Sequence, residues 1–194
     1  MNRQLVTLGV VVVLAVAGAA CAGTYQVDPV HSTVGFSVKH LGISEVHGYF
    51  TNFSGTIEYD ADKPEAAKAQ GIVQVASVDT RVAARDKHLR SPDFFDAEKY
   101  PEIKFETISA VKGSDGWVVK GRFTMHGTTR EIELRGKVEG PVKDPWGKMR
   151  VGLSASTTIN RQDYGVSWNQ KLDAGGMVLG DQVAIELNIE GVAP

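Results

Sequence analysis

Residues 149–159, MRVGLSASTTI, place apolar side chains on alternate positions from Met149 to Ile159, with small or polar residues between most of them. Residues 183–190, VAIELNIE, repeat the same pattern near the C-terminus. An alternation of period two is typical of a β-strand that has one dry face and one wet face. Both segments are therefore predicted to be strands that cover an apolar interior with one face only.

Segments of similar character follow one another along most of the chain. We predict eight principal strands, at residues 25–38, 46–59, 71–78, 103–108, 117–125, 130–138, 148–159 and 182–189. Turn residues at 113–116 and 126–128 predict hairpins, and a change of parity near Thr51-Asn52 predicts a β-bulge. Since closure removes exposed strand edges, the pattern predicts an all-β fold, an antiparallel up-and-down barrel of eight strands. A barrel of this size is either filled by side chains or hollow enough for one small ligand.

One connection is predicted to hold a short helical insertion. Thr80 can cap a helix over residues 82–89, and Ser91-Pro92 would end it. We expect this helix to cover the outer face of strand 71–78, where Val73 and Val75 are expected to point outward. The same two valines would suit a homodimer contact equally well.

The segment around this helix, residues 85–101, mixes charged residues with three aromatic ones. Two interpretations follow. Phe94 and Phe95 would plug one end of the barrel, while Asp86 pairs with Arg90 on the helix. Alternatively, the segment is a lid over a cavity, since ordered insertions beside a barrel mouth commonly serve ligand sites.

The first 22 residues have the layout of a secretory signal peptide. Arg3 is the one charged residue before an apolar run, which ends in small residues around Cys21. Cleavage after Ala22 would leave residues 23–194 as a single periplasmic domain without cysteine. Two alternatives are a bacterial lipoprotein anchored through Cys21 and an uncleaved membrane anchor, although the run is shorter than the ~20 residues of a spanning helix.

Composition and motifs exclude several function classes. The formal net charge is −2 and no basic run occurs, so a nucleic-acid partner is not expected. The five histidines show no zinc-ligand spacing. The chain has no G-x-S-x-G elbow and no G-x-G-x-x-G loop after a strand. We therefore expect neither an enzyme nor a protein that holds a metal or a cofactor.

Short motifs recur in a fixed order along the chain. They are YQVDPVHS at 25–32, HLG at 40–42, GYF at 48–50, VDT at 78–80, the segment 85–101, GRFTMHGTT at 121–129, INR at 159–161, DYG at 163–165 and GD at 180–181. In their joint order and spacing they resemble the YceI-like family of secreted bacterial polyisoprenoid-binding proteins. Phe123, where the family usually has an aliphatic residue, and His126, at a commonly apolar turn position, are small departures.

This resemblance implies a lipocalin-like barrel with an elongated apolar pocket for an isoprenoid chain. Strand parity then selects the residues expected to line the pocket, which are Phe36, Val38, Phe50, Phe105, Phe123, Leu134, Leu153 and Ile185. A polar head group at the mouth would meet His31, Arg85, Arg161 or Trp168. An alternative for the two arginines is structural pairing with Asp86 and Asp163.

The function that the sequence favours is a periplasmic carrier of an amphiphilic lipid, most simply an isoprenyl phosphate or a quinone. Such a protein would bind a long-chain amphiphile and contact a membrane transiently. None of the inward positions selected above is ionisable, which argues against an enzyme that acts on the lipid. The other alternative is a ligand-free structural or envelope-stress module whose barrel is filled by side chains.

Overall fold

The computed structural model describes residues 22–173 and 175–194. The predicted signal segment, Cys21 included, lies outside the described residues except for Ala22. Within the described residues, no helix is long and apolar enough to cross a bilayer.

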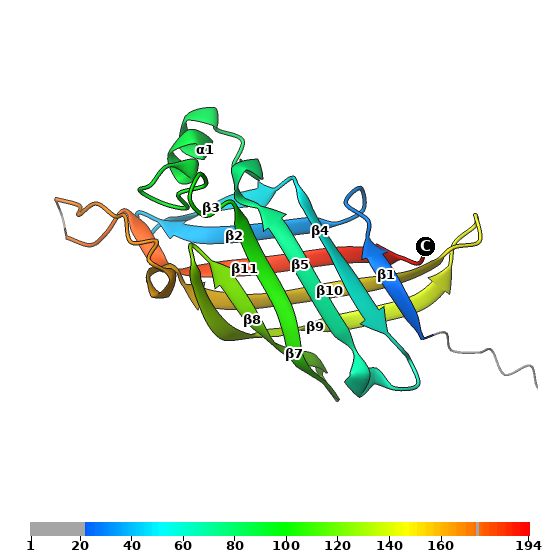
Figure 1. Cartoon of the computed structure of the whole chain (residues 1–194). Coiled ribbons are helices and arrows are strands. Elements are labelled where there is room, and N and C mark those ends of the chain that lie inside the picture. Colours follow the sequence, from blue (N-terminus) through cyan, green and yellow to red (C-terminus); the bar gives the residue numbers. More distant parts are fainter. Residues whose placement is uncertain (1–21, 174) are drawn as a thin grey trace, which may run out of the picture.

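The described residues form a β-barrel with one α-helix beside one end (Figure 1). The strands are β1 Gly23–Val27, β2 Thr33–His40, β3 Ser44–Phe50, β4 Phe53–Tyr59, β5 Lys68–Gln74, β6 Val78–Asp79, β7 Glu102–Gly113, β8 Gly116–Met125, β9 Thr128–Lys143, β10 Met149–Asn160 and β11 Leu179–Val192. The helices are α1 Ala83–Arg90 and three 3₁₀ turns at Pro64–Ala66, Val75–Ser77 and Arg161–Tyr164.

The sheet closes on itself in antiparallel order. The order β1–β4–β5–β7–β8–β9–β10–β11 is completed by a pairing of β11 with β1. β2 continues along β11 where β1 ends, β3 pairs with β2, and the short β6 pairs with β3. The all-β, up-and-down barrel of eight strand positions with a short helical insertion is therefore confirmed.

The first three predicted strands are each divided in two. Segment 25–38 breaks between β1 and β2, where the Asp28 carboxylate accepts a hydrogen bond from the Val30 N–H. Segment 46–59 breaks between β3 and β4 at Thr51-Asn52, where a bulge within one strand was predicted. Segment 71–78 becomes β5, a 3₁₀ turn and β6. Short polar side chains that bond nearby backbone groups compete with the strand ladder and explain the first break.

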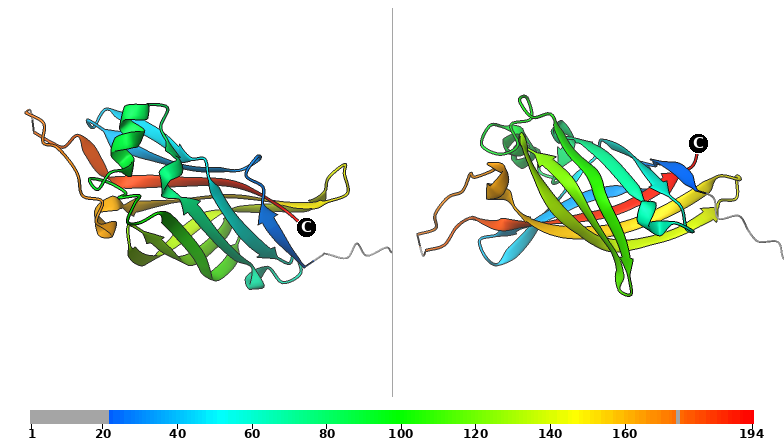
Figure 2. Two further views of the ribbon diagram at one scale, coloured as in Figure 1. Left: turned by 45° about the horizontal axis from the view of Figure 1, so that its top comes forward. Right: turned by 60° about the horizontal axis from the view of Figure 1, so that its bottom comes forward.

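The helical insertion differs from its prediction in place and capping. Residue 82 precedes α1 as its N-cap without a side-chain hydrogen bond. Thr80 instead donates its N–H and hydroxyl to the Asp86 carboxylate, at 2.8 and 2.5 Å. Arg90 donates to the Val78 carbonyl rather than to Asp86. Figure 2 shows α1 over one end of the barrel, not over the outer face of β5.

Val73 and Val75 point into the molecule, so their predicted outward placement is wrong. Val75 is almost fully buried in the apolar cluster beneath α1, and Val73 packs against that cluster. The exposed neighbour on β5 is Ile72, at 38% exposure. A homodimer contact through the two valines therefore loses its basis.

Two apolar clusters fill the two ends of the barrel. At the end away from α1, Tyr25, Tyr59 and Trp117 are buried together, and the rings of Tyr59 and Trp117 lie 6.1 Å apart. At the α1 end, Phe94 and Tyr164 belong to a second buried cluster. The candidate functional site lies in the space between these two clusters.

The wall of the barrel opens along one line. The ladder between β9 and β10 runs from Met149–Lys143 to Ser156–Arg135. Beyond that point, β9 pairs with β8 over residues 128–136, and residues 157–160 of β10 pair with β11. The two strands therefore diverge toward the α1 end.

Candidate functional site: the barrel cavity

The barrel encloses a cavity of about 430 Å³ with a mostly apolar wall. Side chains from most strands and from the insertion around α1 form this wall. Phe36, Leu153 and Ile185 face the interior and yet are only half-buried, because the space in front of them is empty. A barrel filled by its own side chains would bury these residues completely. The interior is therefore hollow, with a volume within the range of small-molecule sites.

All eight residues selected by strand parity lie in the cavity wall. Phe50, Phe123 and Leu134 are buried, and the other five are half-buried. The rings of Phe36 and Phe50 lie 5.7 Å apart, so they form a continuous aromatic surface on β2 and β3. Strand parity was sufficient here because the register shifts of β7, β10 and β11 lie at residues 107–109, 150–152 and 179–183, away from the selected positions.

Other wall residues were not selected from the sequence. Tyr59 and Trp117 close the end away from α1, and Leu89, Phe94 and Phe95 close the other end from the insertion. Phe94 and Phe95 were predicted from the sequence to plug the α1 end, whereas Leu89, Tyr59 and Trp117 were not selected. Phe95 lies 5.9 Å from Phe50, measured between ring centroids.

The insertion both plugs the barrel and covers the cavity. Phe94, His88 and Trp168 form a cluster in which ring centroids lie 4.9 to 5.1 Å apart. All three residues line the cavity. The two interpretations of segment 85–101 therefore describe the same residues, since Phe94 and Phe95 both plug this end and line the cavity.

Arg85 lies in the cavity wall at the α1 end and is half-buried. Its Nε donates to the Thr80 hydroxyl at 2.8 Å, and its Nη2 donates to the Thr80 carbonyl at 2.9 Å. Asp86, the alternative structural partner, accepts from Thr80 instead. These bonds hold the guanidinium in the wall of a mostly apolar cavity, at its α1 end.

Arg161 is buried at the same end, where it also lines the cavity, and its hydrogen bonds are made to groups of the protein itself. Its guanidinium donates to the carbonyls of Gly180, Val166 and Trp168 at 2.8 to 2.9 Å, and lies 3.3 Å from the Asp181 carboxylate. The carboxylate beside Arg161 is that of Asp181, not that of the predicted partner Asp163. Desolvation lowers the pKa of Arg161 from its ordinary value, and Asp181 opposes that effect. The arginine ties the segment after the third 3₁₀ turn to β11.

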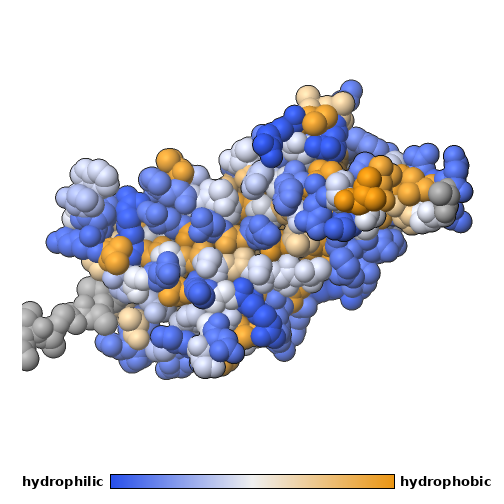
Figure 3. Space-filling model, turned by 180° about the vertical axis from the view of Figure 1, so that it is seen from behind, coloured by the Kyte–Doolittle hydropathy of each residue, from blue (hydrophilic) through white to orange (hydrophobic). Residues whose placement is uncertain are grey.

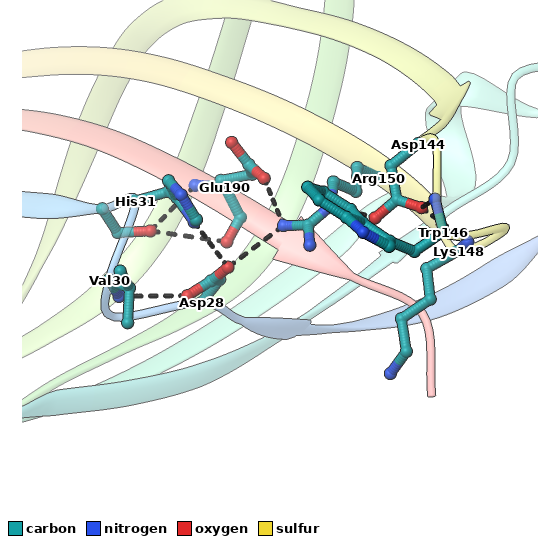
Figure 4. Close-up of polar contacts among 9 residues, drawn as sticks. Asp28, Val30, His31, Asp144, Trp146, Lys148, Arg150 and Glu190 are labelled. Atoms are coloured by element: carbon teal, nitrogen blue, oxygen red, sulfur yellow. Dashed lines mark hydrogen bonds and ion pairs between the residues drawn. The ribbon is translucent and has the colours of Figure 1, made fainter.

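His31 does not line the cavity. It belongs to a surface network with Asp28, Glu190 and Arg150 (Figure 4). Arg150 contacts both carboxylates and also donates to Asp144 at 2.8 Å. His31 is 2.8 Å from the Asp28 carboxylate, which also accepts from a backbone N–H and from Arg150.

These contacts lower the pKa of Asp28 from 3.8 to about 2, with the His31 hydrogen bond as the largest cause. Asp28, His31 and Glu190 come close enough together to hold a cation. The Arg150 guanidinium supplies the positive charge at this place, so the network is complete as an ion-pair cluster.

Comparisons with known proteins agree with this fold. The model of the YceI-like domain family matches residues 25–191. A UPF0312 protein of Photorhabdus laumondii is 37% identical over 194 residues, covering 99% of this chain and 98% of the relative. The crystal structure of a Campylobacter jejuni YceI protein is 29% identical, with a TM-score of 0.70 over 80% of this chain and 90% of that one.

A polyisoprenoid-binding domain from Saccharophagus degradans shares the fold at 17% identity, with a TM-score of 0.65 over 88% of this chain and 98% of that one. The family match spans nearly all of the described barrel, and the curated relative is similar over its whole length. The chain therefore belongs to the YceI-like domain family.

Proposed function

We propose that the protein binds the hydrocarbon chain of a polyisoprenoid lipid inside the barrel and carries it as a non-enzymatic binding protein. The observation that carries this proposal is the hollow apolar interior, whose inward residues Phe36, Leu153 and Ile185 are left half-buried. The polyisoprenoid-binding domain of Saccharophagus degradans supports the choice of ligand class.

The cavity suits a long chain with one polar end. Its wall offers apolar side chains along the barrel axis, while Arg85, His88 and His40 line the cavity from α1 and β2. We propose that the head group lies at this end, near Arg85 and beside the Trp168 ring. A chain of about 20 carbons at about 0.3 kcal/mol per atom yields about 6 kcal/mol, or a dissociation constant of tens of micromolar.

The cellular location that we propose is the periplasm. The layout of residues 1–22 supports export through a cleaved signal, with lipid attachment at Cys21 as the alternative. A carrier in this compartment would shield an apolar chain from water.

A ligand-free structural module is the second function considered from the sequence. Its barrel would be filled by side chains at the density of a protein core. The cavity of about 430 Å³ favours the carrier instead.

Native mass spectrometry of the protein purified from a bacterial periplasm, followed by solvent extraction, tests the proposal. We expect one isoprenoid per protein molecule. A protein that is empty and also takes up no added quinone would refute it.

A pair of variants tests the wall. Leu153→Asp places a charge in the apolar cavity, while Ser154→Asp places the same charge on the exposed outer face of β10. Uptake of a fluorescent isoprenoid should be lost in the first and kept in the second. Equal uptake by both folded variants would exclude Leu153 from the binding site.

A further inference from the structure

Two loops meet at the α1 end of the barrel. The turn between β2 and β3 closes through a hydrogen bond from the Ile43 N–H to the His40 carbonyl, at 3.1 Å. The Leu41 N–H in that turn donates to the Val178 carbonyl at 2.8 Å, just before β11. The Val178 N–H in turn donates to the Gln170 carbonyl at 2.9 Å. The two loops are therefore held together as one structural edge.

This edge exposes large apolar side chains, which we call the apolar rim: Leu41, Ile43 and Met177. Their exposures are 38%, 82% and 44%. Figure 3 shows apolar side chains gathered at the end of the molecule where these loops lie. Three apolar residues exposed together at loop tips are unlike apolar residues scattered singly over a surface.

The backbone of the β2–β3 turn adds a second observation. Leu41 has φ = 54° and Gly42 has φ = 73°, so both central residues lie in the left-handed region. Glycine adopts this region freely, whereas asparagine and aspartate are the side-chain-bearing residues most often found there. A leucine at this position is strained, and it places an apolar side chain at the tip of a hairpin. Strained residues that the surrounding structure maintains cluster at functional sites.

The apolar rim is continuous with the cavity. His40 and Val178, the neighbours of Leu41 and Met177 along the chain, both line the cavity wall. The opposite end of the barrel is closed by the buried rings of Tyr25, Tyr59 and Trp117. The rim therefore borders the end of the cavity at which half-buried wall residues reach the surface.

We propose that the apolar rim inserts into the surface of a lipid bilayer, so that the ligand passes between membrane and cavity without crossing water. This inference rests on the proposed function and names the partner surface of the same site. A stable protein interface needs about 800 Å² from each partner, which three side chains on two loop tips do not supply. Shallow insertion into the headgroup region requires only a few apolar side chains.

Two exposed lysines lie beside the rim, one of them in an ion pair. Lys171 pairs with Met177 in an isolated antiparallel β-bridge and is exposed. Lys39, on β2, is also exposed and lies 3.3 Å from the Glu45 carboxylate. Lysines beside apolar residues can contact lipid phosphates while the apolar side chains insert.

Site-specific fluorescence tests the orientation. Residues 22–194 contain every strand of the closed barrel and no cysteine, so Ile43→Cys and Val142→Cys each supply one labelling site. Val142, near the end of β9, is 60% exposed and lies next to the β9–β10 hairpin, at the end of the barrel away from the rim (Figure 1). On vesicles of phosphatidylethanolamine and phosphatidylglycerol, an environment-sensitive label should shift to the blue at position 43 and stay unchanged at position 142. A shift at position 142 alone overturns the proposal.

Charge substitutions provide the matched measurement. Ile43→Asp should lower the vesicle partition constant by about tenfold or more, the loss expected when one large aliphatic side chain no longer inserts. Trp146→Asp, at an equally exposed apolar residue of the β9–β10 hairpin, should leave it unchanged. Equal effects of the two variants, or a wild-type protein that does not bind vesicles, overturn the proposal.

Titration with farnesol in solution separates the two proposals. Ile43 lies outside the cavity wall, so Ile43→Asp should bind farnesol as the wild type does. A protein that takes up farnesol without binding vesicles refutes the docking rim alone. A protein that binds vesicles and takes up no isoprenoid refutes the proposed function.

Discussion

Replacing Gly71 with leucine should strengthen the fold and weaken ligand binding at the same time. Gly71 lies on β5 in the cavity wall, and a Cβ added there would meet nothing nearer than the Ser54 carbonyl oxygen, at 3.8 Å. The leucine side chain adds four carbon atoms to this wall, and they would occupy space that a bound chain could otherwise use.

The two effects have opposite signs because the new side chain and the bound ligand would occupy the same space. Burying the new side chain, and removing the flexibility of glycine from the unfolded chain, should raise the free energy of unfolding by about 2 kcal/mol. A bound chain loses room for about four carbons at about 0.8 kcal/mol each, which is about 3 kcal/mol or roughly 100-fold in affinity.

Urea denaturation and competition between geranylgeraniol and a fluorescent isoprenoid measure both quantities. Gly152→Leu is the matched control, since Gly152 lies on the outer face of β10 with no atom nearer than the Glu139 Cβ, at 3.9 Å. Its isoprenoid affinity should equal that of the wild type. Unchanged affinity in Gly71→Leu, or a loss of stability there, would show that the ligand does not use this part of the cavity or that the space is not free.

Further variants test the parts that support the cavity. Arg161→Ala leaves three carbonyls without their donor and should lower the free energy of unfolding by about 3 kcal/mol in urea, with unchanged affinity of the folded protein for a neutral isoprenoid alcohol. A loss of that affinity would indicate a ligand contact instead. Gly136→Ala puts a Cβ 1.9 Å from the Ser154 carbonyl oxygen, so the β9–β10 ladder must shift and thermal unfolding should occur at a clearly lower temperature, whereas Gly113→Ala, with 3.7 Å of space, should be tolerated. Because the folded pKa of Asp28 is lowered to about 2, its charge stabilises the protein above the unfolded pKa near 3.8 and loses that effect as the pH falls toward 2. Asp28→Asn should therefore cost about 1–2 kcal/mol at neutral pH and nothing near pH 2, and a pH-independent difference in urea midpoints would contradict this linkage.

Strand parity predicted the parts of the structure that depend on local alternation. β10 and β11 pair over eleven residue pairs with Leu153 opposite Ile189, as expected for two strands that turn the same face inward. The breaks in the first strands were only partly visible, because they depend on side chains that bond the backbone at particular places. Asp28 does so within its own turn, and Ser77 donates to the Gln74 carbonyl in the 3₁₀ turn after β5.

The partners of the two cavity-end arginines could not be predicted from neighbours in the sequence. Arg161 meets carbonyls and a carboxylate that come from the loop after the third 3₁₀ turn and from the start of β11, up to 20 residues away. Arg85 bonds Thr80 because Asp86 is already engaged by that residue. Such contacts follow from the tertiary arrangement of backbone groups, which no periodicity in the chain encodes.

The divergence of β9 from β10 gives the barrel a seam. Ile132 and Ile159 line both the cavity and a polar groove on the outer surface along this seam, so two side chains are shared by the inner and outer surfaces there. A barrel closed by hydrogen bonds all round has a fixed circumference, but this one can widen along the seam without breaking a ladder bond. A bulkier chain should therefore be accommodated first along this line rather than at the closed end of the barrel.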